Sequence, residues 1–256
     1  LCFQTYEVTD YLKEGKNAAG AVLAAGWYKG KMGFEGLEKR RNHYGENTAL
    51  LAQMVIRYED GTEELFVTDE SWSGADAPVV FAEIYDGEIY DGAKEIKGWS
   101  EAGCTAGQWK PVRKLDYDFS VLTGQGSGKV SLMDEVKPKE IFETPEGDLV
   151  IDFGQNMSAL IQVTATGKKG DVIRLDCFEV LDSKGNVYLD NLRGAKESLQ
   201  YTFGEDGTIT YRPSFTFMGF RYAKIVSFPG TPEPGNFIAH AIHTNMERTG
   251  FLETSN

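Results

Sequence analysis

The sequence has 256 residues, and its 26 Lys or Arg against 39 Asp or Glu give a formal net charge of −13, which excludes broad nucleic-acid binding because phosphate contacts need clustered cations. With 41% hydrophobic and 12% aromatic residues, the chain has enough apolar material for one or two packed domains, which excludes disorder throughout. The longest uncharged apolar stretch, residues 17–28, is shorter than the roughly 20 residues of a membrane span, so we expect no membrane partner.

Short runs of β-branched and aromatic residues alternate with glycine-containing turns along the chain. The 29 glycines lie largely in Asp-Gly and similar pairs, which are typical of hairpins. We predict strands at residues 3–8, 18–23, 51–58, 64–68, 79–84, 149–153, 161–166, 172–178, 199–203, 222–227 and 237–243. In residues 51–58 the alternation is clearest, and it predicts that Met54 and Ile56 share the core face with Ala52 and Tyr58.

Helix is expected only as single turns, at residues 9–14 and 190–195. Between the two strand-rich halves, residues 116–128 have the small, polar composition of a linker. The sequence therefore predicts an all-β protein with two antiparallel β-sandwich domains in tandem, at residues 1–115 and 129–247.

Cysteine and histidine give no sign of a metal site or a disulfide framework. The three cysteines are odd in number and far apart, and the three histidines lack metal-ligand spacing. Reduced thiols favour a cytoplasmic location, with secretion left open. The chain starts at Leu1 and shows no signal peptide, which indicates a fragment.

No catalytic residue is predicted, because no nucleophile elbow or phosphate-binding loop occurs and 39 carboxylates make any acid and base pair arbitrary. We also predict no cofactor. Two segments with aromatic rings nevertheless suit sugar binding. These candidate substrate-binding residues are Trp27, Tyr28, Tyr85, Asp86, Glu88, Tyr90 and Asp91. The alternatives are core anchoring for Trp27 and two solvated turns for residues 85–91.

A second set of polar residues lies among the predicted strands of the second half. Polar side chains in such places need partners, so we expect them to converge, with Arg193 paired to a carboxylate. This predicted structural cluster consists of Asp152, Asn156, Glu179, Asn191 and Arg193.

An ordered series of motifs resembles the accessory β domains of bacterial α-L-rhamnosidases over nearly the whole chain. In the first half the motifs are Phe3-Gln-Thr-Tyr-Glu-Val-Thr-Asp10, Gly26-Trp-Tyr-Lys-Gly30, Thr68-Asp-Glu-Ser-Trp72 and Ile84-Tyr-Asp-Gly-Glu-Ile-Tyr-Asp91. In the second they include Asp152-Phe-Gly-Gln-Asn156, Glu179-Val-Leu-Asp182, Asn191-Leu-Arg193 and Phe215-Thr-Phe-Met-Gly-Phe-Arg-Tyr222. Each motif is weak alone, and their order is specific.

The resemblance implies an N-terminal-type sandwich, truncated at its start, followed by a concanavalin-like (jelly-roll) sandwich. Residues 248–256 then resemble the entrance to an (α/α)6 catalytic barrel, which is missing together with its acid and base. The implied partners are that barrel and rhamnose-containing glycosides, which the parent enzyme hydrolyses with inversion. The rival hypotheses are a pair of carbohydrate-binding modules without catalysis and a purely structural domain. Calcium dependence stays open.

Overall fold

The computed structural model describes residues 2–32, 41–126 and 128–255. About 40% of the chain is strand and 8% is helical, so the predicted all-β class is confirmed. The only α-helix of the described residues is α1 (Gly26–Lys29). Single 3-10 turns are η1 (Thr9–Tyr11), η3 (Gly92–Lys94), η4 (Phe119–Val121), η5 (Asp190–Leu192) and η6 (Pro234–Asn236). None of these described helices has the length and apolarity to cross a membrane.

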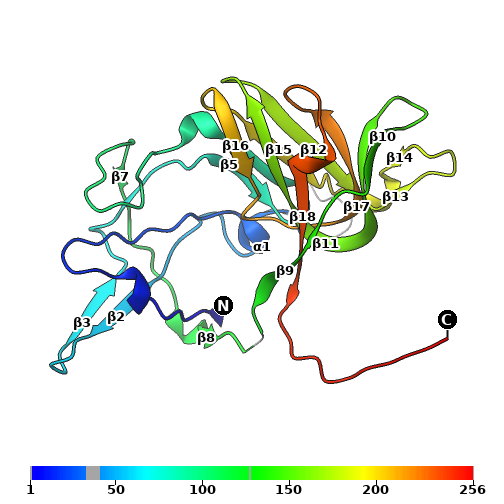
Figure 1. The fold of residues 1–256 in the computed structure, drawn as a ribbon. Helices are drawn as coiled ribbons and strands as arrows, with labels where there is room; N and C mark the ends of the chain where they lie inside the picture. Colours follow the sequence, from blue (N-terminus) through cyan, green and yellow to red (C-terminus); the bar gives the residue numbers. More distant parts are fainter. Residues whose placement is uncertain (1, 33–40, 127, 256) are drawn as a thin grey trace.

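One curled sheet of ten strands forms the body of the protein (Figure 1). Its main path runs in the order β5-β6-β15-β12-β17-β11-β18-β9, and β10 and β16 also pair with β11. The bounds are β5 (Val79–Glu83), β6 (Gly87–Asp91), β9 (Val130–Val136), β10 (Glu140–Glu143), β11 (Leu149–Gly167), β12 (Val172–Phe178), β15 (Ser198–Thr202), β16 (Gly207–Tyr211), β17 (Met218–Ser227) and β18 (Phe237–Thr244).

The long strand β11 carries the chain from one part of the curled sheet to another. Its first part pairs with β10 and β17, and its last part pairs with β18 and β16. The register with β17 shifts between Asp152 and Met157. Gly154 sits in this bulge with φ of 83°, a conformation that glycine adopts without steric cost.

The hydrophobic core follows from alternation along these strands. In β11 the side chains of Ile161, Val163 and Ala165 are buried, and they pack with apolar side chains of β12, β15, β17 and β18. Cys177 lies in the same core, where burial raises the pKa of its thiol. A smaller cluster around Phe178 and Tyr222 packs beneath the short hairpin of β13 (Val180–Leu181) and β14 (Val187–Tyr188).

The hairpin β5–β6 belongs to the large sheet, although it precedes the predicted linker at residues 116–128. Strand β6 pairs with β15 in parallel, with Ser198 opposite Gly87 and Thr202 opposite Asp91. All other pairings in the sheet are antiparallel among the described residues. The first half of the chain therefore supplies an edge of the sheet that the second half builds.

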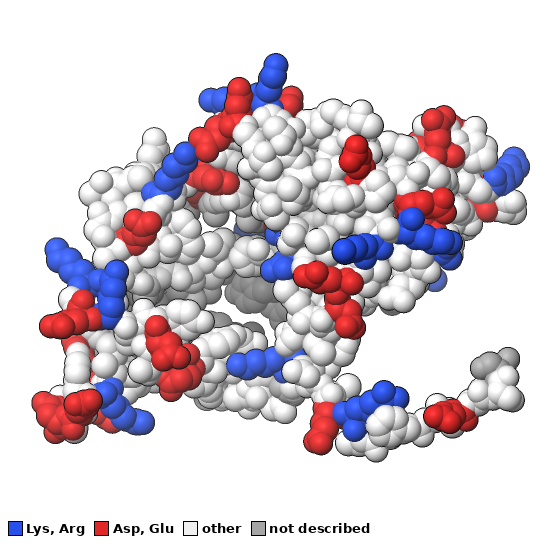
Figure 2. All heavy atoms as spheres, viewed as in Figure 1, with Lys and Arg blue, Asp and Glu red and all other residues white. Residues whose placement is uncertain are grey.

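The rest of the first half forms small two-stranded units. They are β1–β8 (Cys2–Phe3 and Thr123–Gly124), β2–β3 (Gln53–Arg57 and Glu63–Val67) and β4–β7 (Ser73–Gly74 and Lys110–Pro111). In β2, Met54 and Ile56 are less exposed than Val55 and Arg57, as the alternation predicted, but Ala52 and Tyr58 are exposed and none of the four is buried, because β2–β3 is a separate two-stranded unit. Figure 2 shows Lys and Arg dispersed among Asp and Glu over the face in view.

Several predicted strands match observed ones within two residues, but the chain also differs from the prediction in particular places. Residues 18–23 are not a strand, and residues 4–8 do not extend β1. Residues 149–153 and 161–166 are parts of the single strand β11. In the large sheet, strands β6, β9, β10 and β16 were not predicted, and neither were helix α1 and the short strands β4, β7, β8, β13 and β14. The two predicted helical turns shrink to η1 and η5.

Candidate functional site

Glu179, between β12 and β13, is the centre of a polar cluster at the surface. Its two carboxylate oxygens accept hydrogen bonds from Asn156 Nδ2 at 3.2 Å and from Asn191 Nδ2 at 2.7 Å. Asn156 ends the bulge of β11, and Asn191 lies in η5, so three separate segments meet at this carboxylate. We call Asn156, Glu179 and Asn191 the Glu179 cluster. Exposed amide groups beside a carboxylate can exchange hydrogen bonds with hydroxyl-bearing partners.

Glu197 lies against this cluster in an unusual environment. Burial, reinforced by the charge of Glu179, raises the pKa of its carboxyl group to about 7. Its Oε2 atom is buried without a hydrogen-bond partner among the described residues. Its backbone has φ of 44°, and its N–H donates to the carbonyl of Tyr85 at 3.1 Å. Because the unpaired oxygen is closed to solvent, it cannot reach a substrate, and we interpret Glu197 as structural.

We expect Glu197→Gln to remove a dependence of stability on pH. A folded-state pKa of about 7 against 4.5 means that the folded chain binds more protons between these values. The free energy of unfolding therefore falls as pH rises through this window and levels off above it. Urea unfolding at several pH values should show that the free energy of unfolding of the wild type falls by about 1–3 kcal/mol across this window, whereas that of Glu197→Gln does not. Equal pH slopes for wild type and Glu197→Gln would contradict this, and Glu59→Gln, in an exposed turn, is the control.

Asp152 is held by Arg221, which was not among the predicted cluster residues. Arg221 on β17 donates from Nε and Nη2 to the two oxygens of Asp152, each at 2.9 Å, and this bonding lowers the pKa of the carboxyl group. Asp152 Oδ1 also accepts the N–H of Gly154 at 2.7 Å, so the ion pair fixes the bulge. Arg193 follows η5 with φ of 58°. The structure thus unites Asn156, Glu179 and Asn191 and gives the role of carboxylate partner at Asp152 to Arg221.

The aromatic candidates Trp27 and Tyr85 lie together. Their rings meet edge to face with centroids 5.3 Å apart, and Trp27 is 44% exposed. Tyr28 is half-buried, and its carbonyl accepts the N–H of Tyr44 at 3.3 Å. Lys196 and Glu197 both donate their N–H groups to the carbonyl of Tyr85. The Trp27–Tyr85 pair is therefore linked through backbone to the loop that follows Asn191, one member of the Glu179 cluster.

The acidic candidates of residues 85–91 are turned inward. Asp86 is buried and pairs with Lys31 at 2.8 Å. Glu88 is 1% exposed, and it accepts hydrogen bonds from Tyr211 Oη at 2.6 Å and from the backbone N–H groups of Ser214 and Phe215 at 3.0 and 2.8 Å. Neither carboxylate can accept a hydrogen bond from a sugar at the surface, because both are buried inside the protein.

Tyr90 and Asp91 have partners within the chain as well. The Tyr90 ring stacks on Tyr201 with centroids 5.2 Å apart, and its hydroxyl donates to Glu95 at 2.9 Å. Burial raises the pKa of Tyr90. Asp91 caps η3 by accepting the N–H of Ala93 at 3.1 Å.

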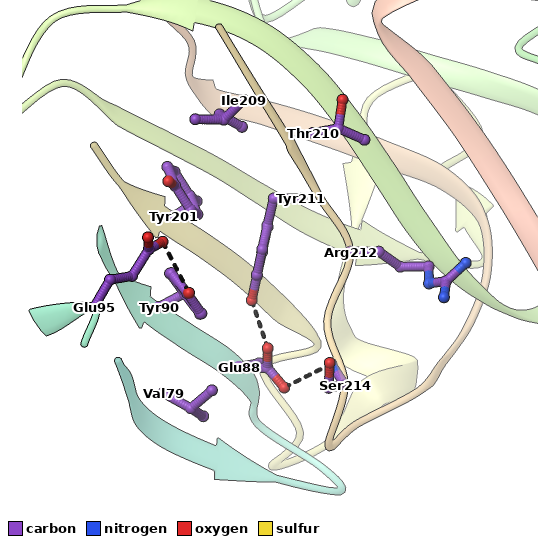
Figure 3. Close-up of a pocket in the computed structure, with 10 residues that line it drawn as sticks. All are labelled: Val79, Glu88, Tyr90, Glu95, Tyr201, Ile209, Thr210, Tyr211, Arg212 and Ser214. Atoms are coloured by element: carbon purple, nitrogen blue, oxygen red, sulfur yellow. Dashed lines mark hydrogen bonds between the residues drawn. The ribbon is translucent and has the colours of Figure 1, made fainter. Parts of the chain in front are cut away.

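A surface hollow of about 380 Å³ opens between β6 and β16 (Figure 3). Figure 3 shows Tyr90, Tyr201 and Tyr211 gathered on one side of it, while Arg212 points away from these rings. The hollow is lined by Val79, Glu88, Tyr90, Glu95, Tyr201, Ile209, Thr210, Tyr211, Arg212 and Ser214. Since the three tyrosine rings pack on one another, we interpret the hollow as the mouth of the sandwich rather than as a sugar platform.

Two family profiles match the chain in sequence order. Residues 1–134 match the α-L-rhamnosidase N-terminal domain, and residues 142–243 match the bacterial α-L-rhamnosidase concanavalin-like domain. The chain belongs to the α-L-rhamnosidase family. The family boundary thus falls between residues 134 and 142, although β5 and β6 of the first rhamnosidase domain lie in the sheet of the second.

Curated α-L-rhamnosidases align with the chain over almost its whole length. The α-L-rhamnosidase of Streptomyces avermitilis is 37% identical over 254 residues, which cover 99% of this chain and 24% of that protein. One α-L-rhamnosidase of Formosa agariphila is 27% identical over 260 residues, with 99% and 27% covered. The chain therefore spans about a quarter of the length of these relatives.

Solved rhamnosidase structures contain the same fold. The native α-L-rhamnosidase from Aspergillus terreus superposes with a TM-score of 0.89 at 34% identity, covering 100% of this chain and 30% of that one. The Streptomyces avermitilis enzyme complexed with L-rhamnose gives a TM-score of 0.79 at 37% identity, covering 86% and 21%. The chain thus corresponds to one part of these longer rhamnosidase polypeptides.

Proposed function

We propose that this chain is the non-catalytic β region of a larger α-L-rhamnosidase. Catalysis, by inverting hydrolysis of terminal α-L-rhamnose, would belong to an (α/α)6 barrel elsewhere in the polypeptide. The match of the entire chain to 30% of the Aspergillus terreus rhamnosidase structure is the observation that carries the proposal. The proposal assigns no cofactor to these residues, places the parent enzyme in the cytoplasm and leaves calcium to be tested by titration.

Within that enzyme, the region would buttress the barrel and border the sugar site. The Glu179 cluster supports this role because the exposed amide groups of Asn156 and Asn191, beside the half-buried Glu179 carboxylate, can hold hydroxyl groups or a neighbouring domain. Asp86 and Glu88, which the sequence suggested as sugar-binding residues, are instead buried and have structural roles.

The proposal is tested by assaying the pure 256-residue chain on an aryl α-L-rhamnoside. We expect no turnover above background, because two carboxylates roughly 6.5–9.5 Å apart with room for a water are needed for inversion, and the proposal places them outside this chain. Turnover that is lost in Glu179→Gln or Glu197→Gln would overturn it, since catalysis would then reside in these residues.

A second candidate, a carbohydrate-binding module pair, is favoured by the exposed Trp27–Tyr85 pair. We expect free L-rhamnose to bind the chain weakly or not at all, because an open site buries too little of a small ligand. Calorimetric titration decides between the two. Saturation at millimolar rhamnose that disappears in Trp27→Ala, but persists in the control Trp109→Ala, would favour the binding module.

A further inference from the structure

The large sheet ends at β9, and the outer edge of this strand has no partner strand among the described residues. Every strand pairing of β9 goes to β18, and no other backbone hydrogen bond joins residues 130–136 to a described segment. An open edge with apolar side chains pairs readily with another segment, so native proteins protect edges with charges, bulges or cover.

The two halves of β9 differ in this protection. Between His240 and Ile242 the register with β18 shifts, and Asp134 and Glu135 carry charges beside this irregularity. The half nearer the start of the strand is regular, with Val130 opposite Thr244 and Leu132 opposite Ile242. Val130 is 63% exposed and Leu132 is 45% exposed. One half of the edge is thus protected by charge and bulge, and the other presents apolar side chains.

Neighbouring residues extend this apolar half into a patch. The ammonium group of Lys129 lies 4.7 Å from the centre of the exposed Tyr6 ring, and the N–H of Asn245 donates to the carbonyl of Lys129 at 3.0 Å. Met246, the next residue, is largely exposed. We define the β9 patch as Tyr6, Val130, Leu132 and Met246. Exposed apolar groups gathered around one strand end are typical of interaction surfaces.

The C-terminal segment leaves the sheet at this patch. It runs from Asn245 away from the body as extended chain (Figure 1), and its side chains Phe251 and Leu252 are almost fully exposed. Relatives of the chain are about four times as long, and it is the start of the C-terminal segment, at Asn245, that lies beside the apolar half of β9. A second copy is a poorer occupant, because each copy carries a net charge of −13.

We propose that the β9 patch is the docking surface for the polypeptide that follows the C-terminal segment in the parent rhamnosidase. The inference rests on the proposed function and deepens it, because it names the face of the sheet that the remainder of the enzyme covers. The polypeptide after the C-terminal segment adds main-chain hydrogen bonds at the β9 edge and buries Val130 and Leu132, as in other cases of strand addition.

Hydrogen exchange tests the docking surface directly. Amide exchange of residues 130–136 is measured in the 256-residue chain and in the same chain extended by its downstream coding sequence. We expect exchange at least about tenfold slower in the extended protein, since covered edge amides open less often. A reading frame that stops after residue 256 would overturn the proposed function itself. A frame that continues but leaves β9 exchange unchanged would overturn only the docking surface.

A charged substitution supplies the matched comparison. Leu132→Lys in the extended protein should return β9 exchange to the rate of the 256-residue chain, because a buried lysine would oppose docking. The control Leu65→Lys changes a leucine of β3 that is 59% exposed and should leave β9 exchange slow. Slow exchange that survives Leu132→Lys would contradict the proposal.

Discussion

Glu88→Ala should lower the free energy of unfolding by about 3–5 kcal/mol, because it removes a buried carboxylate on which three donors depend. The hydroxyl of Tyr211 and the N–H groups of Ser214 and Phe215 would lose their acceptor in the interior. These donors lie more than a hundred residues away from Glu88 in sequence, so the loss detaches β6 from the end of β16 and the loop that follows it.

Urea unfolding followed by tryptophan fluorescence measures this loss. Glu88→Gln should give an intermediate effect, because its amide keeps the size of the side chain but cannot accept from all three donors. Glu59→Gln, in an exposed turn, should change stability by less than about 0.5 kcal/mol. A Glu88→Ala variant as stable as the Glu59→Gln control would show that the buried carboxylate does not hold the two parts together.

A double-mutant cycle with Tyr211→Phe separates the hydroxyl from the backbone donors. If the Tyr211 hydroxyl acts through Glu88, the two substitutions are non-additive, since residues that share a hydrogen bond are coupled.

Local periodicity predicted much of the second half, because the start of β12 alternates between buried and more exposed residues and β18 is rich in apolar residues. It failed at β6. The Asp-Gly pairs around Gly87 and Asp91 indicated two turns, and an acidic residue such as Glu88 is normally placed outside. Its burial depends on donors contributed by Tyr211 and the loop after it, and no local pattern carries that information.

The sequence predicted only part of the polar cluster around Glu179. Polar side chains between strands must find partners, which correctly united Asn156, Glu179 and Asn191. The pairing of Asp152 with Arg221 was not predicted, because it depends on the register of β11 against β17. Sequence reasoning also missed the raised pKa of Glu197, which arises from burial against Glu179 in the folded state.

Buried polar contacts couple the two rhamnosidase domains, alongside the packing of Tyr90 against Tyr201 and Tyr211. Lys31, Glu83, Asp86 and Glu88 are buried in the first domain, whereas Ala82 is its only buried apolar residue in the described ranges before residue 135. Thr216 donates its hydroxyl to the carbonyl of Glu83 at 3.1 Å, which adds another link to the second domain. Because hydrogen bonds are directional, such contacts fix the position of the β5–β6 hairpin against the second domain more narrowly than apolar packing alone would.

Gly87→Ala should destabilise the chain by about 3–4 kcal/mol, because two independent effects act at this position. Gly87 has φ of 98°, which L-residues rarely adopt. A Cβ atom there would also lie 1.9 Å from the carbonyl oxygen of Ser198, the residue paired with Gly87 on β15. Because a backbone oxygen cannot move aside without breaking the ladder, β6 must shift away from β15.

The control for the backbone effect is Gly170→Ala. Gly170 has φ of 89°, close to that of Gly87, but no heavy atom lies within 4 Å of its added Cβ. We expect it to cost only about 1 kcal/mol, the strain of the left-handed conformation alone. Urea unfolding gives both values, and faster hydrogen exchange of residues 198–202 should occur in Gly87→Ala only, since these amides belong to the strand that β6 covers. Equal losses in the two variants would mean that the parallel β6–β15 pairing yields to the extra methyl group, and that the first domain is joined to the sheet less rigidly than its buried charges indicate.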